Sequence, residues 1–131
     1  MNFESEIETL IRARYPILYV ITPEELRVQE VLLAIAARRK KKLFEWTCSN
    51  GLVPAGTSIQ SQKQRNGATR EPLAALDQVI ERVEPAIFLF KDFHPFLTRG
   101  NFAVIRRLKD IALHLKNSFK TIVLVSPVME I

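Results

Sequence analysis

The stretch that decides the fold is A-I-F-L-F-K-D-F-H-P, residues Ala86 to Pro95. Its first five residues are all apolar, and two of them are aromatic. A short unbroken apolar run is typical of a strand buried on both faces, as in a parallel sheet covered by helices. Asp92 follows the run, so a carboxylate is expected at the carboxyl end of a central strand, where open α/β sheets bind ligands.

Helical and strand patterns alternate along the rest of the chain. Apolar residues recur at helical spacing over residues ~3–14, 23–38, 73–83 and 104–115, and the other strand patterns cover residues 16–22, 43–47 and 121–125. The order α-β-α-β-α-β-α-β predicts a three-layer α/β fold, a parallel sheet with helices on both faces. The apolar–polar alternation of 43–47 predicts an edge strand, and 48–69 reads as a long polar loop, mobile around 60–66.

Composition places the chain among ordinary globular proteins. With 131 residues, 47% apolar and 25% charged, it suggests one domain, residues 1–131. No apolar run approaches the ~20 residues that span a bilayer, and the acidic start of the chain does not predict a signal peptide. Cys48 is the single cysteine, so no internal disulfide is expected, its thiol is predicted to be buried and inert, and a cytoplasmic compartment is favoured.

Positive charge is concentrated between residues 31 and 70, a range that contains eight basic residues and one acidic residue, Glu45. We call these eight the basic sector: Arg38, Arg39, Lys40, Lys41, Lys42, Lys63, Arg65 and Arg70. Cations at a helix end favour the helix dipole, so the run 38–42 has a structural interpretation. The alternative is a contact surface for an acidic partner or nucleic acid. Phe44 and Trp46 beside it could stack bases, but strand aromatics are more often core.

An apolar strand ending in Asp suggests a P-loop NTPase-like fold, whose phosphate loop would follow the first strand. That loop requires G-x-x-x-x-G-K-[ST], whereas residues 22–27 read T-P-E-E-L-R. Thr22 is predicted to cap the next helix, with Pro23 at its first position and Glu25 completing a capping box. The helix start is then already supplied with carboxylates, and a triphosphate meets repulsion instead of a cradle.

No residue is predicted to be catalytic. Asp92 stands where a magnesium-binding aspartate of such a fold would lie, but Phe93 follows in place of a water-activating glutamate. We expect Asp92 to be structural, capping the backbone of Phe93 and His94. Asp92 and His94 alone make a poor metal site. The alternative nucleotide-binding group, at the strand ends, is Thr22, Asp92 and Ser126.

Three segments resemble a known family: R-A-R-Y-P-I-L-Y-V-I-T-P-E-E-L-R (12–27), F-L-F-K-D-F-H-P-F-L (88–97) and F-K-T-I-V-L-V-S-P (119–127). They are similar to the start of a AAA ATPase family of cyanobacteria, also encoded in algal plastids as conserved chloroplast open reading frames. The resemblance covers essentially the whole chain. It implies a degenerate ATPase-like N-terminal domain, followed in longer family members by a AAA module with intact Walker motifs. The strand order implied here is 1-4-3-2.

The resemblance sets the functional expectation. The domain would be non-catalytic and serve assembly, partner binding or regulation of the ATP-hydrolysing module, with no cofactor of its own; ATP and Mg²⁺ belong to the full-length family. Its expected partners are its own C-terminal AAA module, other protomers and an unidentified protein, met through the basic sector and the 48–70 loop. The alternatives are residual ATP or ADP binding, or nucleic-acid binding. A cytoplasmic or plastid-stroma location is expected.

Overall fold

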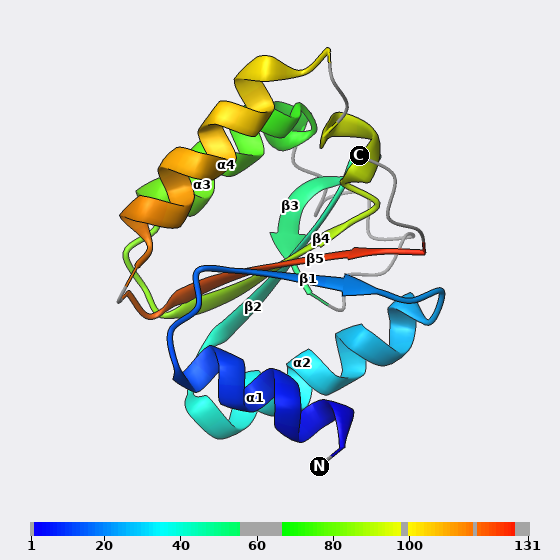
Figure 1. Ribbon diagram of the computed structural model, residues 1–131, viewed down its shortest axis with the longest axis vertical. Helices are drawn as coiled ribbons and strands as arrows, with labels where there is room; N and C mark the ends of the chain where they lie inside the picture. The colour runs from blue at the N-terminus through cyan, green and yellow to red at the C-terminus, as the bar shows by residue number, and fades with distance from the viewer. Residues whose placement is uncertain (1, 56–66, 98–99, 117, 128–131) are drawn as a thin grey trace.

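The computed structural model describes residues 2–55, 67–97, 100–116 and 118–127, which form one mostly parallel sheet with helices packed against it (Figure 1). The helices are α1 (Phe3–Arg12), α2 (Glu25–Arg39), α3 (Pro72–Glu81) and α4 (Phe102–His114). The strands are β1 (Ile17–Ile21), β2 (Lys42–Thr47), β3 (Gly51–Pro54), β4 (Ala86–Lys91) and β5 (Lys120–Ser126), with short 3₁₀ turns η2 (Gly67–Thr69) and η3 (His94–Leu97).

The sheet has five strands in the order β1-β5-β4-β2-β3. The four predicted strands pair in parallel and in the expected relative order. The predicted order nevertheless fails for the sheet as a whole, because β3 adds an antiparallel strand beside β2. The sequence predicts a loop at residues 51–54, so β3 is a correction to that prediction. The loop residues 60–66, predicted to be mobile, lie outside the described residues.

The prediction that β2 is an edge strand is wrong. Glu45 of β2 pairs with Val53 of β3 on one side and with Leu89 of β4 on the other. The chain reverses direction between β2 and β3 near Gly51. Gly51 has a φ of 77°, which glycine adopts without strain. Just before it, the Asn50 N–H donates to Thr47 Oγ1 at 3.1 Å.

Two hydrogen bonds join the η2 turn to the neighbouring strands, one to β2 and one to β3. Trp46 Nε1 donates to the carbonyl oxygen of Thr69 at 2.7 Å, and the Leu52 N–H donates to Thr69 Oγ1 at 2.8 Å. Trp46 is fully buried and stacks on Phe90, with ring centroids 5.4 Å apart. The expectation that the β2 aromatics belong to the core is therefore confirmed, and Trp46 is inaccessible to a base.

Alternate residues of the central strands face opposite layers of helices. Phe88 and Phe90 of β4 belong to the apolar cluster under α3 and α4. Ile87 and Leu89 belong to the cluster under α1 and α2. Figure 1 shows the two helix pairs on opposite sides of the sheet. All five apolar residues of β4 are buried, as their unbroken apolar run predicts.

One buried group on the α2 side is polar. The ammonium of Lys91, at the end of β4, donates to Gln29 Oε1 at 2.6 Å and to Glu45 Oε2 at 3.1 Å. The side chains of Lys91 and Glu45 are 14% and 10% exposed. Burial of a charge is costly unless it is paired and hydrogen-bonded. Gln29 and Glu45 together meet that condition for Lys91.

A second buried lysine caps the C-terminal end of α3. The ammonium of Lys120, at the start of β5, donates to the carbonyl oxygens of Val79, Ile80 and Arg82 at 2.8, 3.1 and 2.7 Å. The last carbonyls of a helix have no partner within the helix. Lys120 supplies one, and it thereby ties the end of α3 to the sheet. Burial lowers the pKa of the Lys120 ammonium.

Candidate functional site

The carboxyl ends of β1, β4 and β5 surround a pocket of about 230 Å³. Its lining includes all three residues of the alternative nucleotide-binding group. The lining residues are Thr22, Pro23, Glu25, Asp92, Val125, Ser126 and Pro127. Topology alone brings the group together, because parallel strands end at the same edge of the sheet. Glu25, from the first turn of α2, was not assigned to the group from sequence.

The start of α2 differs from the prediction. The helix begins at Glu25, and neither Thr22 nor Pro23 is part of it. The hydroxyl oxygen of Thr22 accepts a hydrogen bond from the Glu24 N–H at 3.1 Å, which closes a short turn before the helix. The predicted capping box is therefore wrong, because the Thr22 hydroxyl is used two residues along the chain and does not reach into the helix. Glu25 still places a carboxylate in the first turn, beside the pocket.

Asp92 leaves β4 in the left-handed region, with φ 53°. Its N–H donates to the carbonyl of Val125 at 3.0 Å, which continues the pairing of β4 with β5. Its carboxylate has no hydrogen-bond partner among the residues that the structure describes, so the predicted cap of Phe93 and His94 is not formed. The side chain is left exposed at the mouth of the pocket.

Ser126 lies deeper than Asp92 and is buried. Its Oγ lies 2.9 Å from the hydroxyl of Tyr19 in β1. Two hydroxyls and two carboxylates thus line the pocket, a set of oxygen ligands suited to cations and repulsive to phosphate. Within the described ranges, no group of three or more His, Cys, Asp and Glu side chains could hold a metal ion.

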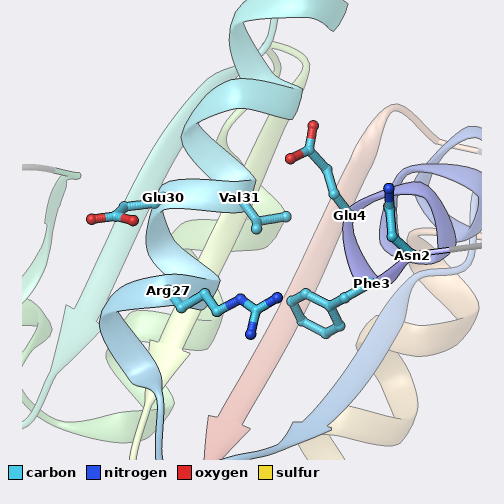
Figure 2. A pocket seen from close by; sticks show the side chains of 6 residues that line it. All are labelled: Asn2, Phe3, Glu4, Arg27, Glu30 and Val31. Atoms are coloured by element: carbon cyan, nitrogen blue, oxygen red, sulfur yellow. The ribbon is translucent and has the colours of Figure 1, made fainter.

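A larger pocket, of about 400 Å³, lies between α1 and α2 (Figure 2). The guanidinium of Arg27 points toward the ring of Phe3, 6.0 Å from its centroid, while Glu30 extends to the other side of α2. Asn2, Glu4 and Val31 complete the lining. Its side chains are of mixed charge and come from helix surfaces, so they do not converge on one point. We therefore take the strand-end pocket as the candidate site.

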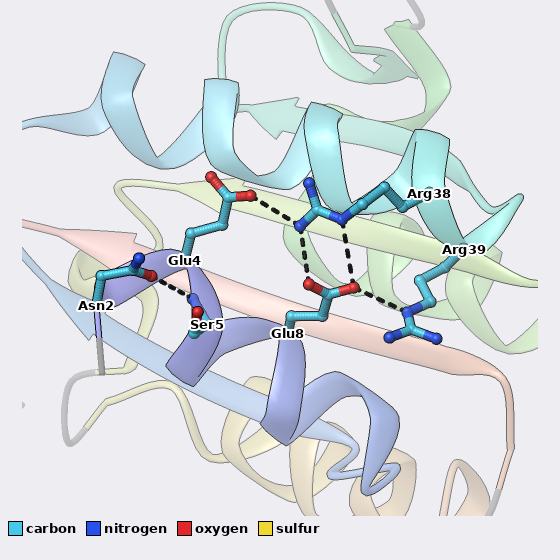
Figure 3. Close-up of polar contacts among 6 residues, drawn as sticks. All are labelled: Asn2, Glu4, Ser5, Glu8, Arg38 and Arg39. Atoms are coloured by element: carbon cyan, nitrogen blue, oxygen red, sulfur yellow. Dashed lines mark hydrogen bonds and ion pairs between the residues drawn. The ribbon is translucent and has the colours of Figure 1, made fainter.

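Two members of the basic sector, Arg38 and Arg39, form ion pairs with carboxylates of α1. Arg38 Nη2 lies 2.8 Å from Glu4 Oε2 and 2.8 Å from Glu8 Oε1, and Arg39 Nε lies 2.9 Å from Glu8 Oε2 (Figure 3). These ion pairs join the end of α2 to α1. The hydrogen bond from Arg38 holds the pKa of Glu8 below its usual value, and Arg39 adds to this effect.

The other members of the basic sector have separate surroundings. Lys40 is the left-handed cap of α2, with φ 56°, and Lys42 lies 3.4 Å from Glu84. Burial, with Arg14 and Arg39 nearby, lowers the pKa of Lys41. Arg70 Nε donates to the carbonyl of Cys48 at 3.1 Å. Lys63 and Arg65 lie outside the described residues.

The exposure of Cys48 and the lengths of the helices test two predictions made from the sequence. Cys48 is exposed, so the prediction of a buried thiol is wrong. It follows β2 in the short turn to β3, where the sequence predicts the start of a long loop. None of the helices in the described ranges is long and apolar enough to cross a membrane.

The chain is similar to a known protein family over nearly its whole length. A family model described as the SpoVK-like AAA ATPase, N-terminal domain, matches residues 3–131. The AAA domain-containing protein ycf46 of Trieres chinensis is 36% identical over 129 residues, which cover 95% of this chain and 24% of that protein. The AAA domain-containing protein ycf46 of Guillardia theta is 34% identical over 129 residues, which cover 96% of this chain and 24% of that protein.

The chain therefore spans about a quarter of the length of these curated relatives. No solved structure matches it. The family match extends over the segments 12–27, 88–97 and 119–127, and it confirms the resemblance predicted from them.

Proposed function

Because the chain belongs to the SpoVK-like AAA ATPase N-terminal domain family, we propose that it is a non-catalytic domain. Its role is assembly, partner binding or regulation of an ATP-hydrolysing AAA module. The single domain of residues 1–131 is a degenerate P-loop-like unit, with the parallel order β1-β5-β4-β2 and helices packed on both faces. The module itself would occupy the part of the longer relatives that this chain does not cover.

The observation that carries the proposal is the turn between β1 and α2. A phosphate-binding turn presents free backbone N–H groups at a helix N-terminus. Here Pro23 has no N–H, and the Glu24 N–H is already bonded to Thr22 Oγ1. Glu25 then places a carboxylate at the positive end of the α2 dipole. This turn does not fit a triphosphate.

The size and charge of the strand-end pocket support the same proposal. Its volume of about 230 Å³ is below the ~300–1,000 Å³ usual for small-molecule pockets. Asp92 and Glu25 offer oxygen ligands for Mg²⁺, but the phosphates that Mg²⁺ would accompany have no cradle beside them. ATP and Mg²⁺ are accordingly assigned to the linked module, and no step of hydrolysis is assigned to this chain.

Calorimetric titration with Mg-ATP and with ADP tests the proposal. We expect no binding heat up to millimolar nucleotide, with the folded state checked by circular dichroism. Binding at about micromolar strength that disappears in an Asp92→Ala variant would contradict the proposal. Leu113→Ala, on the exposed surface of α4, is the matched control for Asp92→Ala.

The second candidate function is residual nucleotide binding at Thr22, Asp92 and Ser126. The observation that favours it is that all three residues line one pocket at the strand ends. It requires the phosphates to avoid Glu25, so Glu25→Gln is expected to strengthen any binding. An unchanged affinity in Glu25→Gln would place the nucleotide elsewhere.

Nucleic-acid binding through the basic sector has weaker support. Arg38 and Arg39 are held by Glu4 and Glu8, which favours a structural role for this end of α2. A partner-binding role for the sector would then depend mainly on its remaining members. Affinity for RNA or DNA that falls steeply with added salt would support the nucleic-acid alternative.

For location, we propose the cytoplasm or the plastid stroma.

A further inference from the structure

The amino ends of the four parallel strands form a surface on the opposite side of the sheet from the strand-end pocket. The Ala86 N–H donates to the carbonyl of Phe119, and the Lys42 N–H donates to that of Pro85, both at 3.2 Å. The loops that lead into neighbouring strands therefore lie side by side. We call this surface the amino edge and define it by Arg14, Tyr15, Lys40, Lys41, Val83 and Phe119.

Two helices end at the amino edge with a cation in an unusual backbone conformation. Arg14, after α1, has φ 63°, and Lys40, after α2, has φ 56°. In each case the N–H of the next residue donates to a carbonyl within the helix, at 3.3 Å after α1 and at 2.9 Å after α2. This is the pattern of a Schellman motif, in which the left-handed residue is usually glycine.

The helix dipole does not account for these two cations. A basic residue near a helix C-terminus balances the dipole, but Arg12 and Arg39 already do so within the last turns of α1 and α2. A residue with a Cβ is strained in the left-handed region, whereas glycine is not. The side chains of Arg14 and Lys40 are therefore better explained by a contact outside the domain.

Lys41 is crowded by like charges. Burial, and then the charges of Arg14 and Arg39, lower the pKa of its ammonium, and no carboxylate of the described residues offsets them. Cations held close together repel one another, and an anion placed between them relieves the repulsion. The amino edge thus favours an anionic ligand.

Apolar side chains are exposed beside these cations. Tyr15, Phe119 and Val83 are 52%, 54% and 96% exposed. The guanidinium carbon of Arg14 lies 4.4 Å from the centroid of the Phe119 ring. Aromatic residues and arginine are enriched in protein–protein interfaces. The combination fits a partner that carries carboxylates next to an apolar side chain.

Acidic residues on both sides of the amino edge favour a peptide over a nucleic acid. Glu8 lies 2.9 Å from Arg39 on one side, and Glu84 lies 3.4 Å from Lys42 on the other. A nucleic acid carries a charge at every nucleotide, so its backbone would run past these carboxylates. One face of Phe119, the ring that a base would stack on, is covered by Arg14. A short acidic peptide avoids both conflicts.

We propose that the amino edge binds a short acidic segment of a partner protein. The carboxylates of that segment pair with Arg14, Lys40 and Lys41, and an apolar side chain beside them packs on Tyr15 and Phe119. The inference rests on the proposed partner-binding role and names the chemistry of the partner. Because the strand-end pocket lies at the other end of the strands, a partner bound here leaves that pocket open.

Fluorescence anisotropy with a labelled synthetic peptide, made of glutamates around one leucine, tests the proposal. We expect binding at about 10–100 μM, and Lys41→Glu should weaken it by at least about tenfold, since it turns attraction into repulsion. Lys109→Glu makes the same charge change on the exposed surface of α4 and should leave the affinity unchanged. The same peptide with glutamine in place of glutamate should not bind.

Lys40→Gly separates a binding role from a structural one. Glycine removes the left-handed strain, so the urea midpoint of unfolding should rise, while peptide binding should weaken by about threefold or more as a cation is lost. A more stable variant with unchanged peptide affinity would overturn the assignment of Lys40. Absence of peptide binding, or equal loss in Lys41→Glu and Lys109→Glu, would overturn the proposal as a whole.

Two further outcomes would also overturn the proposal. A single-stranded oligonucleotide that binds more tightly than the peptide at the same salt would assign the amino edge to nucleic acid. Amide NMR shifts at Arg14 and Lys41 that change with protein concentration, without peptide, would assign it to a second copy of the chain. The nucleotide titration is independent: failure of peptide binding alone removes this inference, and binding of ATP alone removes the non-catalytic role.

Discussion

The ammonium of Lys91 lies 3.1 Å from a carboxylate oxygen of Glu45, across two adjacent parallel strands and under α2. Lys91→Met should lower the free energy of unfolding by about 3 kcal/mol, because it leaves a buried carboxylate without its cation. Urea unfolding at neutral pH measures the loss. The double variant Lys91→Met with Glu45→Leu should recover much of it, and a double variant as unstable as the sum of the two single changes would contradict this account.

A second prediction concerns the hydroxyl of Thr69. Thr69→Val removes the acceptor of the Leu52 N–H and should cost about 1–2 kcal/mol of stability. The amide of Leu52 should then exchange faster in a hydrogen-exchange experiment. Thr69→Ser keeps the hydroxyl and is the control. Similar Leu52 protection in the Val and Ser variants would mean that the bond contributes little to holding β3.

The third prediction is a pH dependence. Arg38, with Arg39, holds the pKa of Glu8 below its usual value, so the unfolded chain binds this proton more readily than the folded protein. The stabilisation is present above the unfolded pKa and is lost as the pH falls through the folded one. Glu8→Gln should therefore flatten the loss of stability in acid. Urea unfolding at a series of pH values measures the slope.

Glu6→Gln is the control for the acid series, because Glu6 is an exposed carboxylate on the same helix. Glu84 contributes in the same direction, since a hydrogen bond from Arg82 lowers its pKa. If Glu6→Gln and Glu8→Gln flatten the acid slope equally, the contacts of Glu8 with Arg38 and Arg39 are not its source.

The fourth prediction concerns the end of α3. Lys120→Met should destabilise the protein by about 2–3 kcal/mol, because three carbonyl oxygens lose their donor. Exchange of amides in the last turn of α3 should accelerate more than exchange in α4. Lys116→Met, at an exposed position after α4, should change neither quantity. Uniform acceleration across both helices would indicate general destabilisation and not a lost cap.

The sequence predicted the alternating elements because their signals are local. The apolar run of β4 and the helical stripes each depend on neighbours within a few turns. β3 was missed because Gly51 and Pro54 in a four-residue strand resemble a loop. Its stabilising partner, Thr69, is 17 residues away from Leu52, and no local pattern announces that contact.

The candidate site could be predicted in outline for a topological reason. Thr22, Asp92 and Ser126 follow parallel strands, and such ends converge whatever the side chains are. The detailed chemistry could not be predicted. Whether the Thr22 hydroxyl caps a helix or closes a turn depends on backbone angles at Glu24. The contact of Glu8 with Arg38 joins residues 30 apart, although the i, i+4 spacing of Glu4 and Glu8 marks one acidic helix face.

The position of β1 in the sheet has a consequence for synthesis on the ribosome. β1 is the first strand made, yet its partner within the described residues is β5, the last of the five. Until residues 120–126 emerge, β1 and the helix before it have no sheet to join. Long-range pairing of this kind slows folding and leaves apolar segments open to aggregation. A nascent chain stalled before β5 should therefore depend on chaperones more than the completed one.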